Sequence, residues 1–123
     1  MPIEDAESED AALKSLGAKI GIPRLAMQDF DLVHADRTGV GRFCDLYERL
    51  ALPENERFYF MQLIVASLDE ALREQVPSAG ELERRVERLL STNVAGFKDI
   101  VEYWGRPRLH TAAMMQRIKG EVP

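Results

Sequence analysis

The sequence contains only one cysteine and two histidines among its 123 residues. Cys44 has no second cysteine with which to form an internal disulfide, and this is typical of proteins from a reducing compartment. His34 and His110 are far apart and stand in no H-E-x-x-H or Cys/His spacing. The sequence therefore predicts no metal site and no bound cofactor.

Long apolar runs are absent as well, since no stretch approaches the roughly 20 apolar residues of a membrane-spanning helix. The first ten residues, MPIEDAESED, lack the basic and then apolar start of a secretory signal. We therefore expect a protein of a bacterial-type cytoplasm with no membrane partner. The apolar share of 46% and the length suit one globular domain.

Positive charge is missing from the N-terminus. The formal net charge is −5, and the first ten residues contain five acids and no base. The rest of the chain is neutral overall, which makes nucleic acid an improbable partner because a basic surface is expected for it. We expect residues 1–6 to form an acidic flexible segment and residues 7–123 to form a single all-helical domain.

Residues 53–75 contain no glycine and no internal proline. The first half of this stretch is apolar on every side, so we expect other elements to surround it. In the second half, Ile64, Leu68 and Leu72 share an apolar stripe with charged residues opposite. The pattern predicts a central helix of roughly 35 Å, buried at its start and half-exposed at its end.

Apolar residues at helical spacing predict the other elements. They indicate helices over residues 7–20, 40–51, 78–91, 94–104 and from Pro107 to 119. Residues 23–34 fit a helix or a strand, and we favour a helix because no second strand is available for pairing. The predicted fold class is all-α: a single-domain bundle of five to six antiparallel helices around residues 53–75.

Several local patterns are compatible with chemistry but have a simpler structural interpretation. Cys44 lies on an apolar stripe with Phe43, so we expect a buried, unreactive thiol rather than a catalytic nucleophile. Residues 38–41, TGVG, precede a helix but lack the Gly-Lys-Ser/Thr of a phosphate-binding loop. Glu83 and Glu87 share a helix face, but no histidine follows a glutamate by three residues as in di-iron bundles. We expect a solvated face there.

The residues that most strongly suggest a binding site lie near Gly105. They are Tyr103, Trp104, Arg106, Arg108 and His110. Tryptophan, tyrosine and arginine dominate the energy of many protein interfaces, and a bend at Gly105 is expected to turn them outward. The alternative is that Trp104 completes the apolar stripe that begins at Phe97, which leaves Tyr103 without a place in the core.

A second candidate surface is the basic face formed by Arg84, Arg85 and Arg88. Glu81 precedes Arg84 and Arg85 by three and four residues, so ion pairs along the helix are the simpler interpretation. Ser78 and Glu81 also form a Ser-x-x-Glu capping pattern at the start of this helix.

We favour a non-enzymatic protein-interaction module, such as an adaptor, an inhibitor or an immunity-type protein. Its partner would be another protein or, in a homodimer, a second copy of the chain. An acidic surface speeds association with a basic partner. One alternative is a nucleic-acid-associated transcriptional regulator that uses the arginine face. The other is an enzyme whose site is assembled from scattered residues and leaves no motif.

Overall fold

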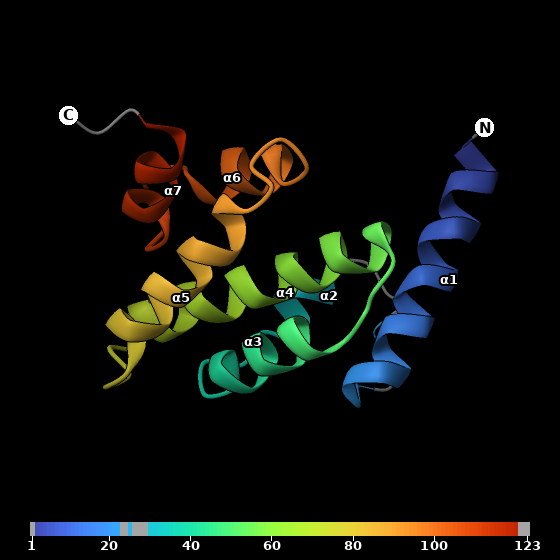
Figure 1. Cartoon of the computed structure of the whole chain (residues 1–123), viewed down its shortest axis with the longest axis horizontal. Helices are drawn as coiled ribbons and strands as arrows, with labels where there is room; N and C mark the ends of the chain where they lie inside the picture. The colour runs from blue at the N-terminus through green and yellow to red at the C-terminus, as the bar shows by residue number, and fades with distance from the viewer. Residues whose placement is uncertain (1, 23–24, 26–29, 121–123) are drawn as a thin grey trace.

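The computed structural model describes residues 2–22, 25 and 30–120. Within these ranges the chain forms helices that pack against one another, and no strand. The helices are α1 (Pro2–Ile20), α2 (Phe30–Val33), α3 (Val40–Arg49), α4 (Glu54–Arg73), α5 (Ala79–Ser91), α6 (Lys98–Trp104) and α7 (Ala112–Lys119) (Figure 1). The predicted all-α bundle is confirmed, with seven helices in the described residues rather than five or six.

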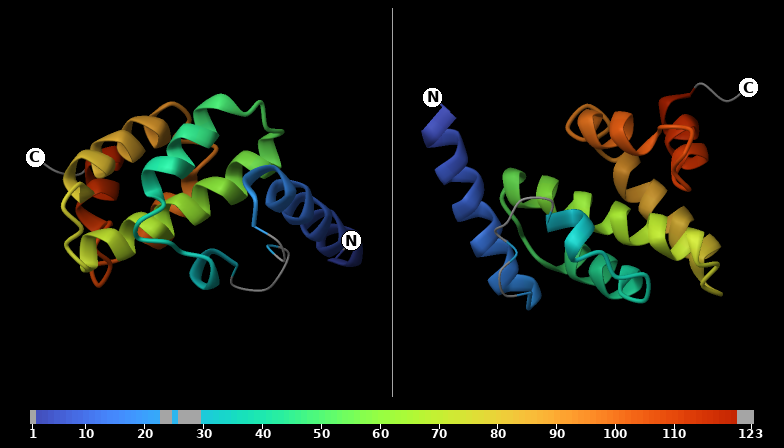
Figure 2. Two further views of the ribbon diagram at one scale, coloured as in Figure 1. Left: turned by 90° about the horizontal axis from the view of Figure 1, so that it is seen from below. Right: turned by 180° about the vertical axis from the view of Figure 1, so that it is seen from behind.

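Helix α4 is the central element, as predicted. Pro53 precedes its first turn, where Glu54 and Glu56 are favourable at the positive end of the helix dipole. Helices α1, α2, α3 and α5 all contact it, and the views in Figures 1 and 2 show it running through the middle of the molecule. None of the helices in the described residues is long and apolar enough to cross a membrane.

The predicted burial of α4 is confirmed for Phe60, Ile64 and Leu68 and for its half-exposed end, but not for the aromatic residues of its first turns. Phe58 and Tyr59, near its start, are only half-buried, whereas every residue from Leu63 to Leu68 is buried. Phe58 and Tyr59 line two hollows in the surface, so their rings are covered on some sides only. An apolar helix segment is buried only where another element packs on it.

The core is formed by large side chains around the middle of α4. Phe43 of α3 meets Phe60 edge to face, with 5.7 Å between the ring centroids. Cys44 is fully buried, as predicted, and its burial raises the pKa of the thiol to about 11. Ser67 is buried too, and its hydroxyl oxygen accepts a hydrogen bond of 2.9 Å from the backbone N–H of Asp36.

Helix α1 lies against α4 through an ion pair as well as apolar contacts. Lys19 Nζ donates to Glu56 Oε1 at 2.7 Å, and Glu56 is buried with only 6% of its surface exposed. The helix begins at Pro2, earlier than the predicted start at residue 7. A proline suits a first helical turn, and the acids that follow it interact favourably with the helix dipole.

Residues 23–34 were predicted as one helix, but only part of this range is described. Phe30–Val33 forms the short helix α2, and Leu25 is buried in irregular structure. Residues 23–24 and 26–29 lie outside the described residues. The predicted loop over residues 35–41 ends when α3 begins at Val40.

The predicted starts of three later helices need correction. Ser78 is the N-cap of α5, but its side chain makes no capping hydrogen bond, so the Ser-x-x-Glu pattern does not form a capping box. Helix α6 begins at Lys98 rather than residue 94, because Asn93 Oδ1 accepts the Gly96 N–H at 3.1 Å and holds the preceding residues in turns. Helix α7 begins at Ala112 rather than at Pro107.

The segment between α6 and α7 folds back onto α4 instead of turning outward. Asp69 Oδ1 accepts the backbone N–H groups of His110 at 2.7 Å and Thr111 at 3.1 Å. The buried Thr111 hydroxyl donates to the Trp104 carbonyl at 2.9 Å. These bonds fix the position of α6 relative to α4, and therefore the position of the aromatic residues at its end.

Candidate functional site

A cleft of about 520 Å³ lies between α1 and α6, with α2 and the first half of α4 completing its walls. We call it the α1–α6 cleft. Its lining residues are Glu9, Phe30, Asp31, Leu32, Phe58, Tyr59, Gln62, Asp99, Ile100, Tyr103 and Trp104. Figures 1 and 2 show α1 and α6 standing apart on either side of the start of α4.

Aromatic rings form three edge-to-face pairs in the walls of the cleft. Tyr59 meets Phe58 at 5.7 Å and Phe30 at 5.9 Å between centroids, edge to face in both cases. On the α6 side, Tyr103 meets Trp104 at 5.1 Å. Edge-to-face rings stabilise each other beyond their burial, so both walls are ordered before any ligand arrives.

The rim of the cleft includes large apolar side chains that water reaches. Leu32 is 53% exposed and Tyr103 is 41% exposed. The guanidinium of Arg106 lies over the Tyr103 ring, 4.5 Å from its centroid. Exposed aromatic and arginine side chains held in a fixed geometry are the usual anchors of a protein interface.

In the part of the chain that the structure describes, the charged residues that line the cleft are acids: Glu9, Asp31 and Asp99. Burial raises the pKa of the Tyr59 hydroxyl, and the carboxylate of Glu9 raises it further. Gln62 also lines the cleft, and its Oε1 is buried with no hydrogen-bond partner in the described part of the chain. Such an unsatisfied acceptor is uncommon in folded proteins and favours a donor from a ligand.

The predicted residues near Gly105 are only partly brought together. Tyr103 and Trp104 line the cleft, and Arg106 stacks beside them. Trp104 is buried, with 3% of its surface exposed, so it belongs to the core and to the cleft wall at once. Arg108 and His110 are exposed and line none of the cleft.

Most of the lining residues that the sequence did not reveal come from other helices, among them Glu9, Leu32, Phe58 and Tyr59, and Asp99 comes from α6 itself. No spacing rule connects them, because the cleft is formed by segments distant in the chain. One signal was available in the run FYF at 58–60. Three consecutive aromatic residues point in three directions around a helix. Packing elements rarely cover all three directions, so one or more of the rings is expected at the surface.

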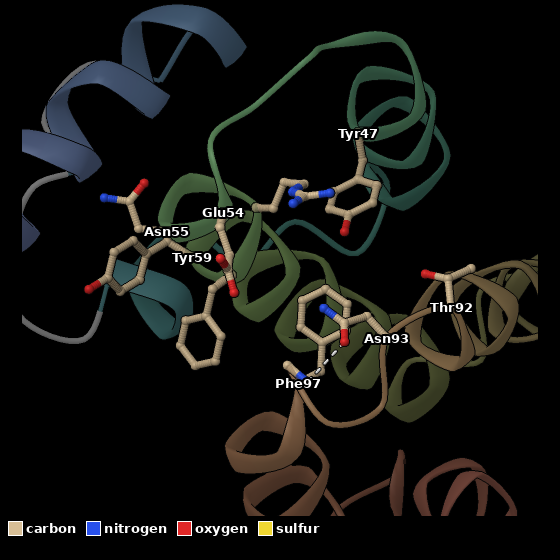
Figure 3. Close-up of a pocket in the computed structure, with 10 residues that line it drawn as sticks. Tyr47, Glu54, Asn55, Tyr59, Thr92, Asn93 and Phe97 are labelled. Carbon is tan, nitrogen blue, oxygen red and sulfur yellow. Dashed lines mark hydrogen bonds between the residues drawn. The ribbon is translucent and has the colours of Figure 1, made fainter.

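A second hollow of about 550 Å³ lies on another side of the first turns of α4, between α3 and the turn before α6. Figure 3 shows Tyr47 of α3 above this space and Asn93 and Phe97 below it, whereas Tyr59 lies on the side of α1. The pKa of the Tyr47 hydroxyl is raised, because burial outweighs the lowering effect of the nearby positive charge of Arg57. The lining mixes one acid with one base, so this hollow has no single electrostatic preference.

The predicted basic face is broken by an internal contact. Arg85 does not pair with Glu81; its Nη2 donates to Asp45 Oδ1 and Glu48 Oε1 of α3, both at 2.7 Å. Arg84 and Arg88 remain at the surface, beside a shallow hollow of about 450 Å³. The three arginines therefore do not form a continuous phosphate-binding surface.

The predicted solvated face on α5 also has a partner. Arg117 of α7 donates to Glu87 Oε1 through Nη2 at 2.8 Å, and Glu83 Oε1 lies 3.7 Å from the same nitrogen. At the start of α3, Asp36 Oδ1 accepts the Thr38 N–H and hydroxyl. A carboxylate thus occupies the TGVG turn, where an anion would have to bind. No group of three or more potential metal ligands occurs in the ranges the structure describes.

Comparison of the chain with protein-family models, curated proteins and solved structures finds no match. Function is therefore inferred from the geometry and chemistry of the α1–α6 cleft.

Proposed function

We propose that the protein is a non-enzymatic helical interaction module of the cytoplasm that binds another protein at the α1–α6 cleft and its rim. The observation that supports this most directly is the stacked pair of Tyr103 and Arg106, exposed beside a cleft lined with aromatic residues. An adaptor, an inhibitor and an immunity-type protein all use such a surface without a catalytic group.

The packing of the rim supports a binding role over a purely structural one. Tyr103 projects from α6 while its neighbour Trp104 fills the core, so Tyr103 is not needed to close the domain. The backbone beneath it is rigid because Asp69 and Thr111 anchor the following loop. A rigid anchor residue loses little conformational entropy when it binds, which increases its contribution to affinity.

The test is to replace the rim residues one at a time. Tyr103→Ala and Arg106→Ala should change the free energy of unfolding by no more than about 1 kcal/mol, since both side chains are exposed. Each should weaken the binding free energy of the partner that the wild-type protein captures by about 2 kcal/mol or more, as expected for a hot spot. Affinity capture with mass spectrometry identifies the partner, and titration calorimetry measures the loss.

Arg108→Ala is the matched control. Arg108 is exposed on the same loop but lies outside the cleft, so its removal changes charge without changing the rim. If Arg108→Ala and Arg106→Ala lower the affinity for the partner equally, the loss comes from the change in net charge, and the rim is not the binding site. A partner that keeps its full affinity for Tyr103→Ala also contradicts the proposal.

A further inference from the structure

We propose that the α1–α6 cleft binds a basic segment of the partner protein, with an arginine or lysine side chain inserted between the Tyr103 and Tyr59 walls. This inference rests on the proposed function and names the chemistry of the partner. Four observations support it, and each concerns a different property of the cleft.

The first observation is its charge. Among the lining residues that the structure describes, three are acids and none is a base. The acids come from three separate helices, since Glu9 belongs to α1, Asp31 to α2 and Asp99 to α6. Carboxylates of Glu9 and Asp99 thus stand on the α1 and α6 walls, and a cation that enters the cleft approaches both. Charge complementarity of this kind selects partners and accelerates association.

The second observation is the aromatic surface. Guanidinium and ammonium groups bind over aromatic faces within about 6 Å of the ring centroid. The Tyr103 ring already holds one such group, because Arg106 lies over it at 4.5 Å. The rings of Phe58 and Tyr59 provide a comparable surface on the α4 side.

The third observation is the unsatisfied acceptor. Gln62 Oε1 is buried and accepts no hydrogen bond from the described residues, although its side chain lines the cleft. An arginine has five N–H donors and a lysine has three, and neither has an acceptor. Rotation of the terminal amide of Gln62 toward the cleft would pair its oxygen with such a donor.

The fourth observation is the continuation of negative charge beyond the cleft. The net charge of −5 equals the excess of acids in the first ten residues, and residues 2–10 belong to α1. The helix that forms one wall of the cleft thus begins with a segment whose sequence is strongly acidic. A basic segment longer than one residue is therefore attracted along α1 as well as into the cleft.

The test uses a peptide of defined sequence as the probe, acetyl-Leu-Arg-Leu-Arg-Leu-Arg-amide. It contains no aromatic residue, so Trp104, the only tryptophan of the chain, reports binding through its fluorescence. We expect saturable binding that weakens with added salt. The same peptide with citrulline in place of each arginine keeps the shape and loses the charge, and it should bind at least about tenfold more weakly.

Variants of the protein locate the bound cation. Asp99→Asn and Glu9→Gln should each lower the affinity for the arginine peptide by about threefold to tenfold, because each removes a carboxylate from the cleft. Glu102→Gln is the matched control: it removes the same charge from an exposed position on α6 that does not line the cleft. It should leave the affinity within about twofold. The peptide affinities of Asp99→Asn and the wild-type protein are compared at conditions where urea unfolding shows that both are equally folded.

Three results would overturn the inference. The first is that the citrulline peptide binds as tightly as the arginine peptide, or that neither binds. The second is that Glu102→Gln weakens binding as much as Asp99→Asn. The third is a partner that needs Tyr103 and Arg106 but is insensitive to Asp99→Asn and Glu9→Gln; it would leave the proposed function intact. A homodimer that Tyr103→Ala dissociates and Asp99→Asn does not is one such case, and sedimentation equilibrium detects it.

Discussion

Helix α4 is covered most completely over Leu63–Leu68, in its second half (the closed half), and less so near its start (the open half), where Phe60 and Met61 are nevertheless fully buried. From Leu63 to Leu68 every side chain is buried, including the polar Ser67, whose hydroxyl bonds to Asp36. Near the start of the helix, Phe58 and Tyr59 are half-buried and form walls of hollows on two sides. The difference shows that apolar composition makes a segment able to be buried, while its neighbours determine whether it is.

The closed half is also where polar groups are fully used. Asp69 holds the loop before α7, and the carbonyl and hydroxyl groups nearby are paired. In the open half, Gln62 Oε1 has no partner within the described residues. The open half also contains a satisfied buried group, because Glu56 is paired with Lys19, but it retains the apolar surface and the acceptor that a partner can use.

The largest expected effect concerns the closed half. Ile64→Ala should lower the free energy of unfolding by about 2–5 kcal/mol, because Ile64 is fully buried and a cavity remains. Phe58→Ala, in the open half of the same helix, should cost less, about 2 kcal/mol, since the side chain is only partly buried. Urea unfolding measures both. A cost below about 1 kcal/mol for Ile64→Ala would show that this half is not tightly packed.

The next prediction tests closure from the α3 side. The pKa of the Cys44 thiol is raised from 9.0 to about 11 by burial. At about pH 8 the native thiol should react with a thiol reagent at least about 100-fold more slowly than in denaturant, because only the thiolate reacts. The same raised pKa stabilises the fold below pH 9, and this contribution is lost as the pH rises to about 11. Labelling at the denatured rate in native buffer would contradict burial.

A smaller effect is expected where α4 holds the loop before α7. Asp69→Ala removes the acceptor of two backbone N–H groups and should cost about 1–3 kcal/mol. Glu70→Ala is the control, because Glu70 only forms a surface ion pair with Arg73 and should cost less than about 0.5 kcal/mol. Thermal and urea unfolding of both variants measure the difference, and equal costs would mean that Asp69 does not anchor α6.

The smallest effect on stability concerns the far end of α1. Figures 1 and 2 show the start of this helix extending beyond the other elements. Deletion of residues 1–6 should therefore leave the melting temperature nearly unchanged, within about 2 °C. It should slow association with a basic partner and reduce the salt dependence of that rate. A large loss of stability would mean that this end is packed on the body.

Periodicity and composition were sufficient to predict the helical class, the central position of residues 53–75, the buried Cys44 and most helix ends near glycine or proline. These features depend on neighbours in sequence, since an apolar stripe or a helix-breaking residue acts over one or two turns. The exposure of Tyr103 followed for the same reason, because it lies off the stripe that contains Trp104.

The contacts of the charged residues were beyond such rules. Arg85 has an acid on its own helix at the right spacing but pairs with Asp45 and Glu48 of α3. The α1–α6 cleft likewise requires Glu9, Tyr59 and Tyr103 from three helices, and no local pattern relates them. Long side chains pair with whichever opposite charge the packing of helices brings near. For that reason the partners of Arg85, the uncovered side of α4 and the acidic cleft became visible only when the helices were assembled in space.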